Sequence, residues 1–393
     1  MSKWQMVKLG DVCEIARGGS PRPIEKYITD DESGINWIKI GDTSESKYIT
    51  KTKQKILPSG MNKSRFVEVG DFLLSNSMSF GRPYIMKIDG CIHDGWLVIK
   101  DQKGMFDKDF LYFLLGSETM YRKFTSLAVG GVVNNLNSEM VRNVVIPLPP
   151  LEEQQKIATE LDKITDLISK RKSQLEKLDL LIKSKFTEMF GDTVSNEMAW
   201  DTEILNNLCS KIGSGATPTG GKQAYKSEGI SLVRSMNVHD GYFKYKDLAY
   251  IDDHQANKLN NVTLCNEDVL INITGASVAR SCVLPSNVLP ARVNQHVSIL
   301  RCGNKILPIY LNNVLIAGSM KKQLLEIGTS NGATREAITK VQLEELQIAV
   351  PPIELQNKFA EYVEKVEQTK EKMQAGLEQL ETLYKARMQE YFG

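Results

Sequence analysis

The chain has 393 residues, of which 41% are hydrophobic and 25% charged, and its formal net charge at pH 7 is +1. That length and apolar content suffice to fill two or three separate cores, so we expect a globular protein. No segment resembles a signal peptide, and no apolar run approaches the roughly 18 residues that a membrane span requires, which favours the cytoplasm.

The six cysteines are scattered and include no Cys-x-x-Cys pair. Reduced, mostly buried thiols are therefore favoured over disulfides, and we predict no metal site. Charge is spread evenly as well: residues 1–150 carry 20 Lys and Arg against 17 Asp and Glu, and residues 191–350 carry 15 of each. A near-neutral chain that binds nucleic acid must gather its basic residues on one face or take charge from a partner.

Short apolar runs bounded by glycine and charged residues predict strands in two successive globular segments. The runs cover 35–40, 72–74 and 96–99 in the first segment, and 230–233, 269–273 and 297–300 in the second. Each segment continues with a predicted helix, at 110–124 and at 309–327, and then with a last strand that leads into a double proline. We therefore predict two mixed α/β domains of roughly 150 residues each.

The same sequence pattern occurs twice, about 200 residues apart. Residues 147–157 read PLPPLEEQQKI and residues 350–359 read VPPIELQNKF, and the segments that follow end in MFG and YFG. Pro149 and Pro351 are 202 positions apart, and so are Gly191 and Gly393. A duplication of this length implies two domain-plus-helix units related by a pseudo-two-fold axis, a symmetry that the two backbones of a DNA duplex share.

A long helix should follow each double proline, because proline is tolerated at the start of a helix and not further inside. The predicted division is a domain at 1–150, a helix at 151–191, a domain at 192–350 and a helix at 351–393. Apolar residues recur along both helices at alternating steps of four and three, a heptad pattern that predicts a coiled coil of roughly 38 residues and about 57 Å.

We predict that the two helices pair antiparallel through this apolar stripe. The pairing residues would be Ile157, Leu161, Ile164, Leu175, Leu178, Ile182, Phe359, Val363, Val366, Leu377, Leu380 and Tyr384. The alternative is that each helix is amphipathic and packs only on its own domain.

No segment predicts catalysis or a cofactor. The glycine-rich stretch at 215–223 lacks the glycine and the Ser or Thr that a phosphate-binding P-loop needs at Ala216 and Gln223. The four histidines lie far apart, without metal-ligand spacing or a nucleophile partner. The double prolines mark helix starts rather than the base pocket of an amino-methyltransferase. We therefore expect no catalytic residue, no metal and no cofactor in this chain.

With two globular segments that each end in a proline-initiated helix, the chain resembles the specificity subunits of type I restriction-modification systems. The opening at 4–19 and the segment GTSNGATREAITK at 328–340 resemble that family too, and the likeness extends over nearly the whole chain. Leu355 stands where the first copy has Glu153, a difference that the family tolerates.

The resemblance implies a non-catalytic DNA reader. Each globular domain would be a target recognition domain that binds one half of a split, asymmetric sequence. The helices would act as a spacer and dock two methyltransferase subunits, which bring S-adenosylmethionine, and restriction subunits would join that complex. Two readers placed one turn of B-DNA apart would be separated by about 34 Å, which helices of the predicted length can span.

Basic residues of both domains are the candidate DNA contacts, because arginine and lysine suit phosphates and guanine edges. The candidates are Arg22, Lys39, Lys51, Lys53, Lys55, Arg82, Lys222, Arg234, Arg280 and Arg292. Lys39 and Arg234 take matching places after their strands, and Arg82 and Arg280 approximately do so. For each of them the alternative is an ordinary solvated side chain.

Two other functions fit parts of this pattern. A recognition subunit of another DNA modification or phage-defence complex would share the domains, although a single-chain enzyme would carry its catalytic motifs here. A protein-binding structural scaffold fits the near-neutral charge, but a scaffold has no need of two diverged domains on one repeated plan. The target bases and the spacer length do not follow from the sequence, because readout depends on side-chain geometry and on DNA shape.

Overall fold

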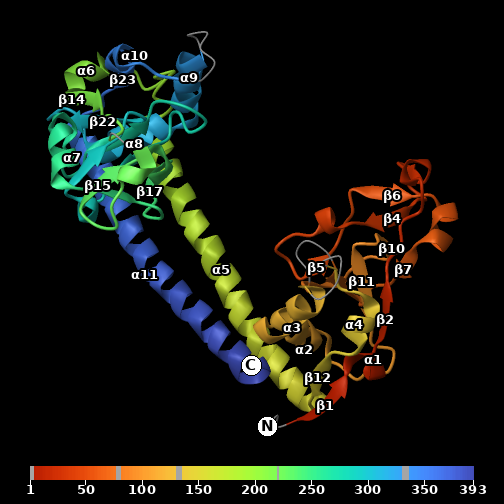
Figure 1. Ribbon diagram of the computed structural model, residues 1–393. Coiled ribbons are helices and arrows are strands. Elements are labelled where there is room, and N and C mark those ends of the chain that lie inside the picture. Colours follow the sequence, from red (N-terminus) through yellow and green to blue (C-terminus); the bar gives the residue numbers. More distant parts are fainter. Residues whose placement is uncertain (1–3, 77–80, 130–134, 219–220, 330–335) are drawn as a thin grey trace. The chain divides into compact units, whose positions relative to one another are not determined.

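The computed structural model describes residues 4–76, 81–129, 135–218, 221–329 and 336–393. Two compact units make up the chain: unit 1 comprises Met1–Lys172 and Ala375–Gly393, and unit 2 comprises Ser173–Gln374. Each unit holds one globular domain, the first half of one long helix and the second half of the other (Figure 1). The fold class is mixed α/β with two long helices, as the sequence predicted.

The first globular domain runs from β1 to β12, and α5 follows it. Its elements are β1 (Gln5–Lys8), α1 (Leu9–Val12), β2 (Glu14–Arg17), β3 (Ile28–Thr29), β4 (Ile35–Ile38), β5 (Tyr48–Ile49), β6 (Gln54–Ile56), β7 (Arg65–Val67), β8 (Phe72–Ser75), β9 (Pro83–Met86), β10 (Gly90–Ile92), β11 (Trp96–Lys100), α2 (Lys108–Leu115), α3 (Glu118–Val129), α4 (Ser138–Arg142), β12 (Val145–Leu148) and α5 (Leu151–Phe190). β1 pairs antiparallel with β12, so the start of the domain lies beside the strand that leads into the long helix.

A five-stranded sheet, in the order β2-β11-β8-β9-β5, forms the centre of this domain. Along β8, Phe72 and Leu74 face a core that includes α2 and α3, whereas Leu73 faces a second core shared with the sheet β3-β6-β4-β10-β7. Successive side chains point to opposite faces of a strand, so a strand that is buried on both faces is apolar throughout. This explains the unbroken apolar run at 72–74.

The second globular domain runs from β13 to β23, and α11 follows it. Its elements are β13 (Thr202–Ile204), α6 (Leu205–Leu208), β14 (Cys209–Ser214), β15 (Ile230–Val233), β16 (Val238–His239), β17 (Tyr242–Phe243), β18 (Ala249–Ile251), α7 (Asp253–Lys258), β19 (Val269–Asn272), β20 (Ser281–Val283), β21 (Ala291–Val293), β22 (Val297–Cys302), α8 (Pro308–Ile316), α9 (Gly318–Thr329), α10 (Lys340–Glu344), β23 (Gln347–Ala349) and α11 (Ile353–Phe392).

The second domain repeats the layers of the first. Its main sheet has the order β14-β22-β19-β20, with Val269 and Ile271 facing the helices and Leu270 facing the core of the smaller sheet β18-β15-β21. Each domain has a parallel pair at the same point of the plan, β4 with β10 and β15 with β21, and the first domain has a further one, β5 with β9. The duplication in sequence is therefore a duplication of layers and of strand directions.

Two predicted helices are in fact broken. The stretch at 110–124 divides into α2 and α3, and the stretch at 309–327 divides into α8 and α9. At the first break the Ser117 hydroxyl accepts a hydrogen bond from the Met120 amide at 3.3 Å, which caps a new helix, and at the second Ala317 has an extended backbone. The prediction of a single helix was wrong because the apolar period continues across both breaks.

The two long helices run antiparallel beside each other within each unit. In unit 1, Nε of Arg387 lies 2.8 Å from a carboxylate oxygen of Glu160, and Lys172 lies 3.2 Å from Glu381. In unit 2, Lys370 lies 2.7 Å from Asp179. As the residue numbers increase along α5, the residue numbers of their ion-pair partners on α11 decrease, which indicates antiparallel helices.

Candidate nucleic-acid interface

The structure brings two of the candidate cations of the first domain together. Arg22 and Lys39 line one cavity of about 840 Å³, together with His93 and Asp94. The Arg22 side chain is 83% exposed, and its guanidinium lies 3.7 Å from the Asp94 carboxylate. Lys39 is held more firmly, because its Nζ donates to Oε1 of Gln54 at 2.6 Å. An exposed arginine beside an oriented lysine is a suitable arrangement for phosphate or a base edge.

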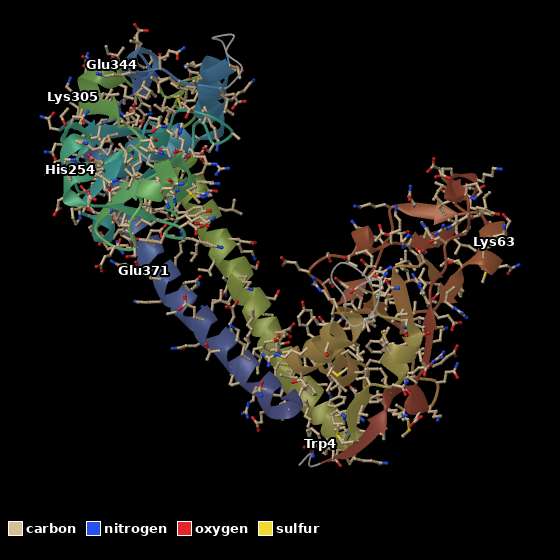
Figure 2. All side chains as sticks on the ribbon, in the orientation of Figure 1. Trp4, Lys63, His254, Lys305, Glu344 and Glu371 are labelled. Carbon is tan, nitrogen blue, oxygen red and sulfur yellow. The ribbon has the colours of Figure 1, made fainter. Side chains whose placement is uncertain are left out.

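The three lysines at 51–55 differ in their surroundings, since two are exposed and one is hydrogen-bonded within the domain. Lys51 and Lys53 are exposed on the segment that leads into β6. Lys55 is half-buried, and its Nζ donates to the carbonyl of Glu32 at 2.8 Å. Figure 2 places Lys63 on the same domain at the end away from α5, where its Nζ donates to the Tyr27 hydroxyl at 2.6 Å.

Lys39 and Arg234 occupy matching positions. Each residue follows the strand of the parallel pair, and its backbone amide donates to the side chain three residues later, Asp42 in one domain and Asn237 in the other, at 2.8 and 3.1 Å. Arg234 lies over the Tyr225 ring at 5.1 Å and donates from Nη2 to a main-chain carbonyl in the segment before β18. The same position of the shared backbone plan thus carries a lysine in the first domain and an arginine in the second.

Arg82 and Arg280 also match. The carbonyl of Arg82 accepts from the Ser75 amide at 3.2 Å, and the carbonyl of Arg280 accepts from the Asn272 amide at 2.9 Å, just before β9 and β20 begin. The Arg82 side chain is exposed and lies over the Tyr84 ring at 5.2 Å, whereas Arg280 is half-buried. Two of the four matching cations are therefore arginines stacked on tyrosine.

The remaining two candidates differ from the rest. Arg292 is only 8% exposed, and its guanidinium donates to the carbonyls of Ala256 and Ala291 and to the side chain of Asn260. Burial lowers its pKa. Arg292 joins β21 to the segment around α7, and we leave it out of the DNA contacts proposed below. The side chain of Lys222, together with residues 219–220 and with 330–335 of the family-like segment, lies outside the described residues.

A pair of loops beside the candidate cations escaped the sequence analysis. The strand-end loop after β2 crosses the loop between β10 and β11, so closely that a Cβ on Gly18 would lie 2.2 Å from the carbonyl oxygen of His93. The crossing is repeated in the second domain, where a Cβ on Gly215 would lie 1.8 Å from the carbonyl oxygen of Val293. Only glycine permits such an approach of two backbones. The glycines of RGGS and GSGAT were visible in the sequence, but the loops that they contact were not.

Each long helix is tied to its own domain by a buried glutamine. Nε2 of Gln154 donates to the carbonyls of Pro149 and Met105 at 2.9 and 3.0 Å, and its Oε1 accepts from the Asp107 amide at 2.9 Å. Gln356 repeats all three bonds in unit 2, at 2.9, 3.1 and 2.9 Å, and both residues are 0% exposed. The repeated glutamine thus fixes each long helix at its start to the loop that precedes α2 in unit 1 and α8 in unit 2.

The predicted pairing residues lie on the inner faces of the helices. Eight of them are buried and four are half-buried: Ile157, Leu161, Ile164, Ile182, Phe359, Val363, Val366 and Leu377, and then Leu175, Leu178, Leu380 and Tyr384. Ile157 and Leu161 belong to the core of the first domain, and Phe359 and Val363 to that of the second. The stripe therefore packs on the domain near each helix start. The same two cores include the end of the other helix, with Tyr384 and Phe392 in the first and Ile182 in the second, so the pairing through the stripe stays a prediction beside the ion pairs above.

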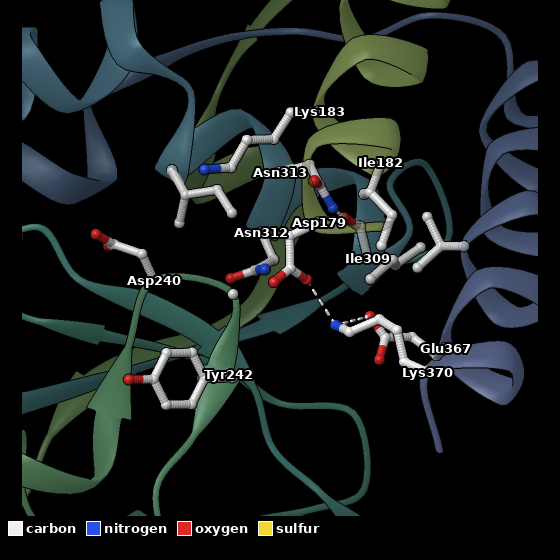
Figure 3. A pocket seen from close by; sticks show the side chains of 13 residues that line it. Asp179, Ile182, Lys183, Asp240, Tyr242, Ile309, Asn312, Asn313, Glu367 and Lys370 are labelled. Atoms are coloured by element: carbon white, nitrogen blue, oxygen red, sulfur yellow. Dashed lines mark hydrogen bonds and ion pairs between the residues drawn. The ribbon is translucent and has the colours of Figure 1, made fainter. Parts of the chain in front are cut away.

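Unit 2 has a hollow of about 270 Å³ where its domain meets the helices, lined by both polar and apolar side chains. Figure 3 shows the lining side chains Asn312, Asn313 and Tyr242 around the bridge from Lys370 to Asp179 and Glu367. At the corresponding joint of unit 1, Lys47 fills the space, with its Nζ 2.7 Å from both Asp109 and Asp162.

Among residues 4–76, 81–129, 135–218, 221–329 and 336–393 there is no group of three or more His, Cys, Asp or Glu side chains that could hold a metal ion. In the same residues no helix combines the length and the apolar character that crossing a membrane requires.

Comparison with known proteins gives one consistent family. Residues 1–177 and 200–382 match the family described as the type I restriction modification DNA specificity domain. The type I restriction enzyme MjaIX specificity subunit of Methanocaldococcus jannaschii is 25% identical over 384 residues, which cover 92% of this chain and 86% of that protein. The type I restriction enzyme EcoBI specificity subunit of Escherichia coli is 22% identical over 392 residues, which cover 92% and 79%.

Solved structures agree on the fold. A chain from a structure of complex assembly and conformational transition in the type I R-M system has a TM-score of 0.61 at 19% identity, and the match covers 99% of this chain and 97% of that one. The S subunit of a type I restriction-modification system from M. genitalium has a TM-score of 0.58 at 12% identity, with 100% and 96% covered.

Proposed function

The chain belongs to the family of type I restriction-modification DNA specificity proteins, and we propose that each of its two globular domains reads one half of a bipartite DNA target. It is a specificity subunit, the non-catalytic DNA-recognition part of a multisubunit restriction and methyltransferase enzyme. In this proposal residues 1–150 and 192–350 are the two target recognition domains, and residues 151–191 and 351–393 are spacer helices.

One observation carries the proposal of two readers. The two domains share a backbone plan but carry different side chains at matching positions, as at the half-buried Lys39 and Arg234. A repeated plan with unlike surface residues is what recognition of two unlike half-sites requires, because base identity is read by side chains while the backbone only positions them.

The helices support the roles of spacer and docking surface. Each is anchored at its start by a buried glutamine and at its end by a buried phenylalanine, Phe190 in unit 2 and Phe392 in unit 1. A helix fixed at both ends keeps its length, which is what a spacer between half-sites needs. Two equivalent helix starts suit two methyltransferase subunits, which supply S-adenosylmethionine, and restriction subunits complete the complex.

The charge of the chain leads to a direct test of this proposal. With a net charge of +1 and cations that are partly engaged by protein acceptors, the isolated subunit should bind duplex DNA weakly. A gel shift on random duplex, with and without a methyltransferase partner, should show tight binding only in the complex. Assembly that is indifferent to DNA would support a structural scaffold instead.

Single substitutions then separate the two half-sites. Arg234→Ala should relax one position of the second half-site, at a cost of about 1 to 3 kcal/mol, and leave the first half-site unchanged. Lys39→Ala should act only on the first half-site. Long-read sequencing of methylated adenines in a host that carries the complex reads both outcomes, and unchanged methylation at every target variant would remove these two assignments.

A further inference from the structure

The loop between β10 and β11 and the loop between β21 and β22 have one geometry. In the first, the Gly95 amide donates to Nδ1 of His93 at 3.0 Å, and in the second, the His296 amide donates to Oδ1 of Asn294 at 3.0 Å. The residue enclosed between donor and acceptor is Asp94 in one domain and Gln295 in the other. These two residues therefore occupy the same position of the shared backbone plan.

The neighbour of this position is also repeated. The hydroxyl of Ser20, on the loop after β2, donates to Oδ1 of Asp94 at 3.0 Å. The hydroxyl of Thr217, on the loop after β14, donates to Oε1 of Gln295. A hydroxyl at the same place on the strand-end loop thus orients a carboxylate in the first domain and an amide in the second. The side chain at the enclosed position can therefore differ between the domains while the hydrogen bond that holds it is kept.

Asp94 presents an unused acceptor to the cavity. Its Oδ1 accepts from Ser20 and lies 2.9 Å from Nε2 of His93, whereas its Oδ2 has Arg22 at 3.7 Å, beyond hydrogen-bonding distance. The side chain is 31% exposed and lines the cavity of about 840 Å³ that holds Arg22 and Lys39. An ionised carboxylate only accepts, so its natural partner is an amino group.

Gln295 presents both a donor and an acceptor. Its side chain is exposed, Oε1 accepts one bond from Thr217, and Nε2 lies 3.2 Å from Nε2 of His296. A primary amide has two lone pairs and two N–H groups, so one of each remains. This is the pair that meets the N7 acceptor and the N6 amino group of adenine in the major groove.

Building on the proposed function, we infer that Asp94 and Gln295 are specificity-determining residues at equivalent positions of the two readers. Asp94 selects cytosine through its N4 amino group in the first half-site, because a carboxylate accepts from that donor, meets only acceptors on guanine and thymine edges, and is repelled by the N7 acceptor beside the amino group of adenine. Gln295 selects adenine in the second half-site by a pair of hydrogen bonds. The positive charges of the neighbouring Arg22 and Lys39 offset the repulsion between the Asp94 carboxylate and the DNA phosphates.

Isosteric variants separate recognition from a purely structural role. Asp94→Asn and Gln295→Glu keep the size of the side chain and an oxygen that can accept the Ser20 or Thr217 hydroxyl, so the loops stay joined. Each variant changes the hydrogen-bonding character of the atoms that would face a base, together with the charge beside Arg22 in the first domain and beside His296 in the second. Glu118→Gln on α3 and Gln347→Glu on β23 are matched controls, with the same chemical changes at side chains that are exposed on other elements.

The test is the adenine methylation pattern of a host that carries this chain with its methyltransferase and restriction partners. The wild-type complex should methylate a bipartite sequence with cytosine in the first half and adenine in the second. Asp94→Asn should reduce the preference for that cytosine by roughly ten-fold, with the second half unchanged, and Gln295→Glu should reduce the preference for that adenine by roughly 5- to 150-fold, with the first half unchanged. Both controls should keep the wild-type pattern.

The failures of the two proposals differ. If the wild-type complex methylates no bipartite sequence, the proposed function fails. If it does so and both variants keep every position, the assignment of Asp94 and Gln295 is overturned. It is overturned as well if Asp94→Asn relaxes a position held by any base other than cytosine, or Gln295→Glu one held by any base other than adenine. If a variant methylates nothing, the purified complex is tested instead by competition binding. The competitors are four duplexes that differ only in the base at the assigned position. Loss of affinity for one base supports the assignment, and equal loss for all four overturns it.

Discussion

The two units attach domain to helix by different means, although their helix starts are the same. In unit 1 a lysine bridges α2 and α5, with Lys47 held between two aspartates. In unit 2 the matching joint is hollow, and the attachment shifts to the end of α5, where the rings of Phe186, Phe190, Tyr310 and Phe359 lie with centroids 4.8 to 5.7 Å apart. In unit 1 the corresponding helix end makes two ring contacts with the domain, Phe392 with Phe110 at 5.5 Å and Tyr384 with Phe113 at 6.5 Å.

The difference teaches which contacts the repeated plan constrains. Gln154 and Gln356 lie in the proline segments and make matching bonds, whereas Lys47 lies just before β5, in the part of the domain that differs between the two units. Residues in the repeated segments fix where a helix begins. Residues in the variable part of each domain supply the second attachment. A partly buried lysine bridge and an aromatic cluster can both hold domain and helix together, because this attachment needs only to be stable.

The largest effect should come from the aromatic cluster of unit 2. Phe190→Ala removes a fully buried ring and should destabilise unit 2 by about 3 to 5 kcal/mol, because the cavity it leaves is lined by other rings. Phe392→Ala should cost unit 1 about 1 kcal/mol less, since fewer rings surround it. Urea unfolding followed by hydrogen exchange in peptides of each unit measures both. A larger loss for Phe392→Ala would reverse the comparison.

The shared attachment should respond equally in both units. Gln154→Leu and Gln356→Leu each leave a partly buried amide and two carbonyls without their partner, which should cost about 3 kcal/mol in either unit. The exposed neighbours provide controls, and Gln155→Leu and Asn357→Leu should change the unfolding free energy by less than about 0.5 kcal/mol. Unequal losses for the two buried glutamines would show that the helix starts are not equivalent.

Lys47→Met should destabilise unit 1 by about 2 kcal/mol, because two aspartates at a partly buried joint lose their partner. Burial lowers the pKa of Lys47, but the hydrogen bonds and charges of Asp109 and Asp162 outweigh it and raise the pKa above its ordinary value. A lysine with a raised pKa stabilises the fold below its unfolded pKa of about 10.4 and loses that contribution as pH rises through the folded value. The difference between wild type and variant should therefore be constant from about pH 7 to 9 and shrink above about pH 10.5. A difference that falls between pH 7 and 9 would contradict the bridge.

The smallest effect is expected for the bridge in the hollow. Lys370→Met should cost unit 2 only about 0.5 kcal/mol, because the side chains of Asp179 and Glu367 are 57% and 47% exposed and water screens them. Raising the salt concentration should remove even that difference, whereas the loss from Lys47→Met should persist. Equal losses for the two lysines would show that the hollow is as important to unit 2 as the bridge is to unit 1.

The candidate interface was predicted in part. The cations were found by residue type, and the repeat itself indicated that Lys39 matches Arg234. Arg292 has the same residue type as Arg234, yet it is buried among main-chain carbonyls, and nothing in the local pattern distinguishes the two. Asp94 and Gln295 were missed because each gains its surroundings from a loop about 75 residues away, as the spacings of 74 and 78 positions to Ser20 and Thr217 show.

The sequence by itself determined the features that depend on neighbours along the chain. These are the duplication, the start of each long helix after its prolines, the apolar stripe of period 3.5 and the alternation of buried strands, since local backbone preference and periodicity are written in consecutive residues. Only the tertiary structure decided which side chains make contacts within the fold and which remain available for binding. Whether a cation faces solvent or a buried carbonyl, whether a joint is filled by Lys47 or left hollow, and which residue stands opposite Gly18 depend on contacts between distant segments, and a single residue type satisfies several such environments.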